Sequence, residues 1–158
     1  MRRSDREVKH MDDIMAIVRR CQVVRLGLVD RGEAYIVPVN FGYERDGDRL
    51  TLYFHGAREG RKASLIQSVG HAGFEMDGAH ALIEGERADQ YSYAYECVMG
   101  TGAATLVTNM AEKTRGLEAL MEHMTGKRHE IDEQAVRHTA VFKLTVETIS
   151  AKKRPMPE

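Results

Sequence analysis

Three runs of alternating apolar and polar residues follow one another early in the chain, and short turns separate them. They cover residues 22–29, 34–43 and 49–55, and the turns at 30–33 and 46–48 contain glycine and aspartate. Turns of this composition join neighbouring antiparallel strands, and a period of two sends alternate side chains to a core and to the opposite face. The first third of the chain is therefore predicted to be an antiparallel meander rather than a parallel β-α-β unit.

The second run contains a proline at position 38. Proline has no N–H to donate to a strand ladder. Pro38 therefore predicts a sheet edge, a bulge, or a backbone that faces something other than a neighbouring strand.

Further strand patterns lie in the second half of the chain. They cover residues 71–76, 79–84, 93–107 and 141–149. A turn is expected at Asp77 and Gly78. Gly100 and Gly102 lie inside the longest of these segments, and small barrels use glycine to turn corners, so this segment is predicted to be one bent strand that crosses the barrel.

Four helices are expected, at residues 12–20, 61–69, 110–125 and 132–137. Asp12 or Asp13 can cap the first, and Asn109 with Glu112 three residues later resembles a capping box for the third. Residues 85–92 are polar and are expected to form a loop. The tail from about residue 151 is expected to be flexible.

The third helix carries a stripe of apolar residues at helical spacing. Its members are Met110, Thr114, Leu117, Leu120, Met121 and Met124. Such a stripe is typical of core or dimer packing, and the alternative is a soft surface for a ligand or peptide.

The whole chain of 158 residues is expected to be one domain, mainly β with helices, in a small antiparallel barrel. Its formal charge of −1 gives no reason to expect nucleic acid as a partner. No stretch approaches the ~20 apolar residues of a membrane span, and the basic start is not followed by the apolar run of a signal peptide. Two distant cysteines fit a reducing compartment, so a cytoplasmic protein is predicted.

Several common chemistries have no motif in this sequence. The fingerprints of dinucleotide, nucleoside triphosphate, zinc protease and serine hydrolase sites do not occur. The seven histidines lack the tight spacing of metal ligands, so no metal site is predicted. Cys97 lies in a strand pattern and is interpreted as a structural thiol rather than a nucleophile.

The junction between the third strand and the second helix concentrates positive charge. His55 ends the strand, Gly56 and Gly60 follow, and Arg58, Arg61 and Lys62 surround the start of the helix. Glycine permits a tight turn and a close approach to a ligand, and the first turn of a helix favours anions. The junction is therefore a candidate phosphate clamp. The alternative is a solvated loop with ordinary surface charges.

Residues 35–41, which contain Pro-Val-Asn, and residues 52–62, which contain His-Gly-Ala and Gly-Arg-Lys, together resemble a known family. They are similar to the FMN-binding split-barrel proteins related to pyridoxamine 5'-phosphate oxidase, in particular the nitroimidazole-resistance (Nim-type) branch. The resemblance covers about residues 11–107 and the closing strand at 142–149. It implies a six-stranded antiparallel Greek-key split β-barrel, a homodimer, and FMN bound in clefts at the dimer interface.

The resemblance also implies roles for individual residues. Val37, Pro38, Val39 and Asn40 would lie along the isoalloxazine ring. Lys62 would bind the FMN phosphate, assisted by Arg61 or Arg58, and His55 would lie beside the flavin as the candidate catalytic residue. The partner subunit would contribute residues 95–98, with Cys97 and Val98 among them, although relatives often have serine at the Cys97 position.

In function, the resemblance implies an FMN-dependent oxidoreductase that reduces nitroaromatic or quinone-like small molecules. A pyridoxamine phosphate oxidase activity is not favoured, because only one anion clamp can be assigned. The alternative from another class is a non-catalytic protein that stores or senses flavin or haem, with His55 or His71 as an axial ligand of the haem.

Overall fold

The computed structural model describes residues 4–157. Its helices are α1 Met11–Arg20, α2 Arg61–Val69, α3 Met110–Thr125 and α4 Glu133–His138, with short 3-10 helices η1 Ser4–Arg6 and η2 Ala88–Gln90. Its strands are β1 Glu7–Val8, β2 Val23–Asp30, β3 Glu33–Asn40, β4 Gly42–Asp46, β5 Arg49–Gly56, β6 His71–Ile83, β7 Ser92–Leu106 and β8 Ala140–Arg154. All four predicted α-helices are present.

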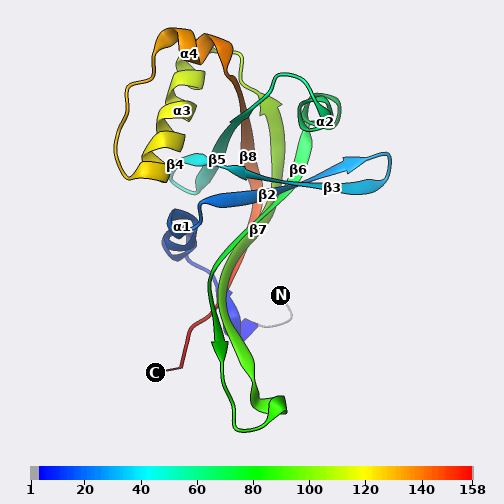
Figure 1. The fold of residues 1–158 in the computed structure, drawn as a ribbon, viewed down its shortest axis with the longest axis vertical. Coiled ribbons are helices and arrows are strands. Elements are labelled where there is room, and N and C mark those ends of the chain that lie inside the picture. The colour runs from blue at the N-terminus through cyan, green and yellow to red at the C-terminus, as the bar shows by residue number, and fades with distance from the viewer. Residues whose placement is uncertain (1–3, 158) are drawn as a thin grey trace.

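The strands form one curled antiparallel sheet in the order β3-β2-β6-β7-β8-β5-β4, with β1 added beside β8 (Figure 1). Neighbouring strands are joined by hairpins at β2–β3, β4–β5 and β6–β7. The path ends at β3 and β4 and does not close, as in a split barrel. The predicted fold class is confirmed, with eight strands in place of six because of the short β1 and a break between β3 and β4.

The break between β3 and β4 occurs at Phe41, which the sequence placed inside one continuous strand. The Phe41 side chain is fully buried, and the chain changes direction there to pair with β5 instead of β2. The proline is correctly predicted to lie at an edge, because Pro38 pairs with β2 alone.

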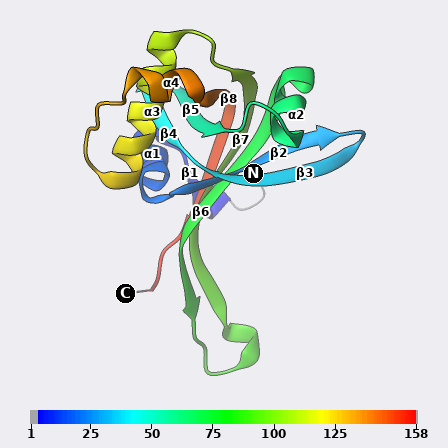
Figure 2. The ribbon, with the colours of Figure 1, turned by 45° about the horizontal axis from the view of Figure 1, so that its top comes forward.

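The β6–β7 hairpin forms an arm that projects away from the rest of the sheet (Figures 1 and 2). The predicted turn at Asp77 and Gly78 is wrong, because β6 continues through a register shift between Gly78 and Ala81 and reaches Ile83. The expected loop at 85–92 contains η2 and forms the tip of the arm.

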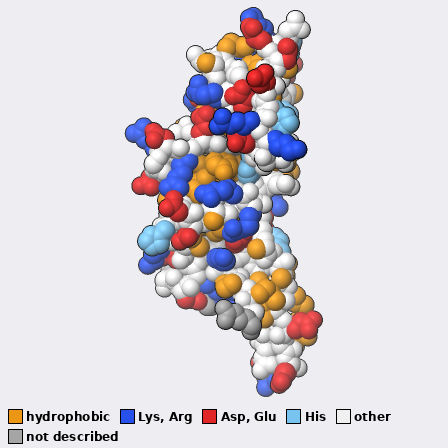
Figure 3. Space-filling view, turned by 90° about the vertical axis from the view of Figure 1, so that its left-hand side faces the viewer, with side chains coloured by type: hydrophobic (Ala, Val, Ile, Leu, Met, Phe, Trp, Pro, Cys, Tyr) orange, Lys and Arg blue, Asp and Glu red, His pale blue; other side chains and the backbone are white. Residues whose placement is uncertain are grey.

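Apolar side chains are exposed along this arm. Leu82, Tyr91 and Tyr93 are 53%, 48% and 49% exposed. Hydrophobic side chains also gather toward the lower, arm-bearing part of the face in Figure 3. These three side chains therefore form an exposed apolar surface on the arm.

Strand β7 bends as predicted. A Cβ atom at Gly100 would lie 1.9 Å from the carbonyl oxygen of Thr148, and one at Gly102 would lie 2.2 Å from that of Thr145. The ladder to β8 shifts register between Thr101 and Gly102. Glycine at these two positions therefore lets β8 cross β7 closely at the bend.

The main core lies inside the curled sheet and beneath α1. Phe54 and Phe142 stack there with their ring centroids 5.7 Å apart, and α1 buries Ile14, Met15, Ile17 and Val18. The prediction that Asp12 or Asp13 caps α1 is wrong, because His10 is the N-cap residue and makes no side-chain cap hydrogen bond. The two aspartates instead lie in the first turn, where negative charge is also favourable.

A second, smaller core lies between the sheet and the helices α3 and α4. It contains Tyr53, Val107, Leu117, Val136 and Val141. Tyr53 lies on the opposite face of β5 from the main core, as expected, but α3 covers it.

Helix α3 begins as predicted, with the Asn109 side chain accepting a hydrogen bond from the Glu112 N–H. Only Leu117 and Leu120 of the expected stripe are buried, and Lys113 and Gly116 complete the buried face, while Met110 is exposed. Strand β8 also runs beyond the predicted 149. Residues 151–154, expected in a flexible tail, pair with β7.

Candidate functional site

The predicted clamp lies where β5 ends and α2 begins, and we call residues 55–62 the β5–α2 junction. The Lys62 side chain reaches back across the junction, and its Nζ donates to the His55 carbonyl oxygen at 3.4 Å. The same nitrogen is 5.7 Å from the ring centroids of both Phe54 and Phe142. The ammonium is thus held by one carbonyl and two aromatic rings.

Gly56 leaves the space that the Lys62 ammonium occupies. A Cβ atom at this position would lie 2.6 Å from Nζ and 3.2 Å from Cε of Lys62. Any larger residue at Gly56 would therefore push the end of the lysine side chain out of its present position.

The Lys62 ammonium has no carboxylate within ion-pair distance among residues 4–157. The side chain is half-buried, and this burial lowers the pKa of Lys62 below the ordinary lysine value. A desolvated cation with no counter-charge favours the arrival of an anion.

The start of α2 adds a second feature of an anion site. Its N-cap residue Gly60 has φ of 115° and offers no side-chain hydrogen bond to the first turn. No acidic residue lies in that turn. The free N–H groups and the positive end of this nine-residue helix lie next to Lys62 in the chain, and both match a phosphate.

The two predicted assistants of Lys62 are engaged elsewhere. The Arg61 Nε donates to Asp30 at 2.7 Å, and the Arg61 guanidinium carbon lies 4.4 Å from the centre of the Tyr35 ring. The Arg58 guanidinium donates to the Arg137 carbonyl oxygen at 2.8 Å, at the end of α4. The structure therefore does not bring the three cations together, and a phosphate contact from Arg58 or Arg61 stays a prediction.

A buried lysine that the sequence analysis missed also points at the end of α4. Lys113 is only 5% exposed, and its Nζ lies 3.5 Å from the Arg137 carbonyl oxygen. Burial, and then the charge of Arg58, lower the pKa of Lys113. The i, i+3, i+4, i+7 spacing of Lys113, Gly116, Leu117 and Leu120 was the signal that could have revealed it.

The candidate ring platform is the edge strand β3. Val37 and Val39 are half-buried and pack against the main core, whereas Pro38 and Asn40 are exposed on the other face. The Asn40 amide donates to the Gln22 carbonyl oxygen at 3.0 Å. Pro38 and Asn40 therefore face away from the main core and are accessible to a ligand.

His55 is exposed on the outer face of β5, at the end of the strand. Its side chain has no hydrogen bond or ion pair within the described part of the chain, and its carbonyl oxygen receives the Lys62 ammonium. The imidazole of His55 is therefore available to form a hydrogen bond with a ligand at the junction.

Cys97 and Val98 lie in β7, on opposite faces of the sheet. Val98 is fully buried in the main core, so only its main chain could touch a ligand. Cys97 is half-buried, and burial raises the pKa of its thiol, which fits the structural role expected for it.

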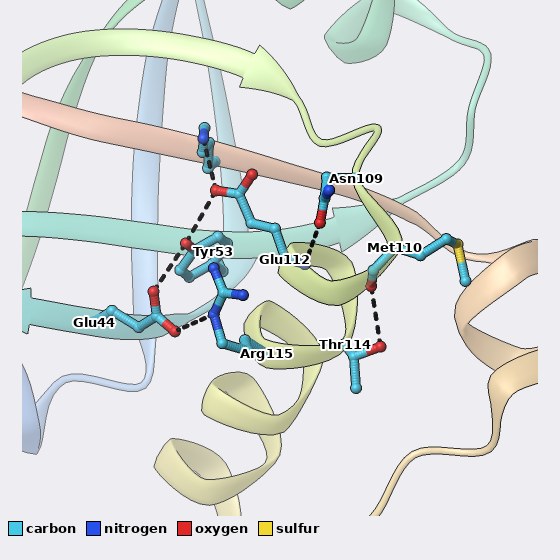
Figure 4. A network of polar contacts seen from close by, with 8 residues as sticks. Glu44, Tyr53, Asn109, Met110, Glu112, Thr114 and Arg115 are labelled. Atoms are coloured by element: carbon cyan, nitrogen blue, oxygen red, sulfur yellow. Dashed lines mark hydrogen bonds and ion pairs between the residues drawn. The ribbon is translucent and has the colours of Figure 1, made fainter.

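The region of β5 next to the junction has a different character (Figure 4). The Tyr53 hydroxyl lies 3.0 Å from a carboxylate oxygen of Glu44 and 3.3 Å from one of Glu112, and burial raises the pKa of Tyr53. Lys143 Nζ lies 2.6 Å from Glu112, and Arg115 Nε lies 3.5 Å from Glu44. These polar groups satisfy one another and hold α3 on the sheet.

A surface cleft borders that network, because Glu44 and Arg115 are among its lining residues. It measures about 1030 Å³ between α3, β4 and the segment after α3, and its lining includes Arg19, Tyr43, Glu118 and His123. A smaller cleft of about 400 Å³ lies between β1 and α1. Neither is lined by the β5–α2 junction or by β3.

Two further properties bear on the function. No group of three histidine, cysteine, aspartate or glutamate side chains among residues 4–157 is placed to hold a metal ion. None of the helices that the structure describes is both long enough and apolar enough to cross a membrane.

Comparison with solved structures gives relatives that match over nearly the whole chain. A provisionally assigned 5-nitroimidazole antibiotic resistance protein from Bacteroides thetaiotaomicron is 29% identical, with a TM-score of 0.79 over 92% of this chain and 85% of its own. The flavocytochrome Anf3 from Azotobacter vinelandii is 21% identical, with a TM-score of 0.79 over 99% of this chain and 73% of its own. An FAD and haem binding protein from Mycobacterium smegmatis is 16% identical, with a TM-score of 0.76 over 97% and 76%.

No curated protein matches the chain. The family model described as pyridoxamine 5'-phosphate oxidase matches residues 10–153, which include the β5–α2 junction, β3 and the arm. This match spans most of the sequence, and the resemblance found in the Pro-Val-Asn and Gly-Arg-Lys segments is confirmed. The chain belongs to the pyridoxamine 5'-phosphate oxidase family.

Proposed function

We propose that this protein binds FMN at the β5–α2 junction and acts as a flavin-dependent oxidoreductase of the Nim type. The observation that carries the proposal is the half-buried Lys62 ammonium, which has no carboxylate partner among residues 4–157 and lies beside the uncapped start of α2. A phosphate dianion would pair with both features through charge-assisted hydrogen bonds.

The ring of the flavin would lie along residues 37–40 of β3. Pro38 supports this placement, because an edge strand without an N–H at that position leaves its outer side free for a ligand. His55 is exposed at the end of β5 and would be the side chain beside the reactive part of the ring. It is the proposed catalytic residue.

The proposal includes a homodimer with FMN at the interface. The exposed apolar side chains Val29 and Ile36 on the β2–β3 hairpin, and those of the arm, support a second copy of this chain as the cover. The junction also lies outside the two clefts described above, and a position between two subunits is consistent with this. The partner's Cys97 and Val98 would approach the ring in this arrangement.

When bound, the flavin would supply two-electron chemistry, accepting a hydride from a reduced nicotinamide and passing two electrons and two protons to a nitro group, which yields a nitroso group and water. The protein's own residues would bind the phosphate, support the ring and leave access for a nitroaromatic or quinone-like acceptor. The name of the Bacteroides relative supports the nitroaromatic class. A cytoplasmic location remains part of the proposal.

The purified protein tests the proposal directly. We expect a yellow protein with flavin absorbance that a reduced nicotinamide bleaches and a nitroimidazole restores. A His55→Ala variant should retain the flavin and lose rate in at least one of the two half-reactions. Unchanged rates of reduction and reoxidation in that variant would remove His55 from the catalytic role.

A non-catalytic flavin or haem protein is the second candidate. Two proteins of similar fold are described as a flavocytochrome and as an FAD and haem binding protein, and their names support haem as an alternative ligand. His55 or His71 would be the axial ligand, although His71 Nε2 lies 3.2 Å from Glu147. A Soret band that disappears in His55→Ala or His71→Ala, or a bound flavin without turnover, would favour this candidate.

A further inference from the structure

The first residue of α2 links the junction to a hairpin far away in the sequence. Arg61 Nε donates to Asp30 Oδ2 at 2.7 Å, and Asp30 is the last residue of β2. The Arg61 guanidinium carbon lies 4.4 Å from the centroid of the Tyr35 ring, which belongs to β3. One arginine therefore contacts both strands of the β2–β3 hairpin.

The position of this contact matters because of what lies on either side of it. Lys62, the proposed phosphate anchor, directly follows Arg61, and β3 carries the proposed ring platform three residues beyond Tyr35 at Pro38. Helix α2 lies above the β2–β3 hairpin in Figure 1, and the free end of the hairpin extends beyond it to the right. The hairpin is at the edge of the sheet, where β3 pairs with β2 alone among the described strands, so Arg61 adds a contact from outside the sheet to the end of the hairpin.

We propose that Asp30, Tyr35 and Arg61 form a clasp that sets the position of the ring platform relative to the phosphate anchor. Arg61 is thus a positioning residue rather than a phosphate ligand. This inference rests on the proposed flavin function and assigns Arg61 a different role from the one that the family resemblance implied.

The chemistry of the clasp favours this role. The planar guanidinium pairs with a carboxylate at its edge and stacks on an aromatic ring with its face, and lysine cannot do both. Asp30 is 23% exposed, so its carboxylate is partly shielded from water, whereas Arg61 remains 52% exposed at the outer side of the helix start. In this arrangement the edge of the guanidinium that carries Nε is directed at Asp30 and its face lies over Tyr35.

Flavin binding by matched variants tests the clasp. Asp30→Asn and Arg61→Gln should each weaken binding of FMN and of riboflavin by the same factor, about threefold to tenfold, because both ligands use the ring platform. The double variant should be no weaker than Arg61→Gln alone, since that variant already removes the ion pair with Asp30. Lys62→Ala should instead weaken FMN and leave riboflavin nearly unchanged, because riboflavin has no phosphate.

Two controls keep the result specific. Tyr35→Phe retains the ring and should behave as the wild type. Asp12→Asn removes another exposed aspartate–arginine pair, 2.6 Å from Arg45, far along the chain from α2, and should leave both affinities unchanged. The clasp is wrong if Arg61→Gln weakens FMN but not riboflavin, since that pattern indicates a phosphate contact, or if neither clasp variant changes either affinity.

A measurement without ligand separates this inference from the proposed function. Amide hydrogen exchange of residues 33–40 should accelerate to the same extent in Asp30→Asn and Arg61→Gln, and not in Asp12→Asn. If the wild type binds no flavin, the proposed function fails while this exchange result still decides whether the clasp holds the hairpin. Unchanged exchange in both variants overturns the clasp whatever the protein binds.

Discussion

Two lysines lie beside strand β5 in different surroundings, Lys143 with a carboxylate partner and Lys62 with a carbonyl oxygen and aromatic rings. Beneath α3, Lys143 lies 2.6 Å from a carboxylate oxygen of Glu112, within a network that also includes Tyr53. Strand β5 then ends at Gly56 in the junction, where the half-buried Lys62 has the His55 carbonyl oxygen and two aromatic rings as its partners among the described residues. Lys143 of β8 is therefore paired with a carboxylate, whereas Lys62 of α2, at the end of β5, has no carboxylate partner among residues 4–157.

The difference shows how a structural charge can be told from a binding charge. A paired group such as Lys143 gains its partner on folding and has little left to offer a ligand. An unpaired, desolvated group such as Lys62 costs stability in the free protein and recovers it when an anion arrives. Lys113 is a third case, because it is buried and has no carboxylate partner among residues 4–157, and its Nζ lies near the Arg137 carbonyl oxygen in the last turn of α4, where positive charge is favourable.

The largest effect on stability is expected at Gly42, where strand β4 lies close against the backbone of α3. A Cβ atom at Gly42 would lie 2.2 Å from the Leu120 nitrogen and 2.4 Å from the Ala119 carbonyl carbon, both in the backbone of α3. Gly42→Ala should therefore lower the free energy of unfolding by about 3 kcal/mol, measured by denaturant unfolding.

Gly27→Ala is the matched control, because its Cβ atom would meet nothing closer than 3.9 Å. The comparison of the two regions also predicts that folded Gly42→Ala protein binds FMN as well as the wild type. A loss of FMN affinity in protein that remains folded would show that the α3 region and the junction act as one unit.

At the junction, Lys62→Ala should change binding rather than stability. Removing a charge-assisted phosphate contact should weaken FMN binding by about 1.5 to 3 kcal/mol, followed by fluorescence titration. The free energy of unfolding should change by less than about 1 kcal/mol, because removal of a desolvated cation that costs stability offsets the packing lost with its side chain.

Lys143→Ala is the counterpart on the other side of the comparison. It should lower stability, since it leaves Glu112 without its closest partner, and it should not change FMN affinity. Equal effects of the two lysine variants on FMN affinity would contradict the division between structural and binding charges.

The sequence predicted the elements of this fold well because its local signals agree with the tertiary structure. The periods of the strands, the glycine-containing turns and the Asn109 cap all depend on near neighbours in the chain. The errors occurred where distant contacts decide, as at Phe41, whose burial ends β3, and along β6, which continues past Gly78 because β7 pairs with it.

The same limit applies to the candidate site. Chain order placed Arg58, Arg61 and Lys62 together, and the resemblance to a family singled out Lys62 and Pro38. Whether a cation already has a partner within the protein depends on residues up to 79 positions away in the sequence, as for Arg58, which donates to the Arg137 carbonyl oxygen. No local pattern in the sequence reveals such a partner.

A smaller effect is expected from Gly56→Ala, which leaves Lys62 in place but moves its end. The new methyl group would meet only the flexible tip of the lysine side chain, at 2.6 Å from Nζ, so stability should change little. FMN affinity should fall by about 1 kcal/mol because the ammonium is displaced. In the Lys62→Ala background, Gly56→Ala should have no further effect on FMN affinity, and an additive loss would show that Gly56 acts through another contact.

The smallest effect concerns the satisfied side of the comparison and depends on pH. The hydrogen bond from Lys143 lowers the pKa of Glu112 below its value in the unfolded chain. The unfolded chain therefore binds the proton more tightly, so this carboxylate stabilises the fold above about pH 4.5, and the contribution is lost as the pH falls through the lowered pKa. Glu112→Gln should reduce the free energy of unfolding by about 0.5–1 kcal/mol at pH 7 and by progressively less as the pH falls through the lowered pKa of Glu112, because the wild type then loses the charge as well. Denaturant unfolding of the wild type and the Glu112→Gln variant, from pH 7 downward, measures the difference between their free energies of unfolding. If this difference does not change with pH, Glu112 contributes through packing, or through hydrogen bonds that a glutamine can also make, rather than through its charge.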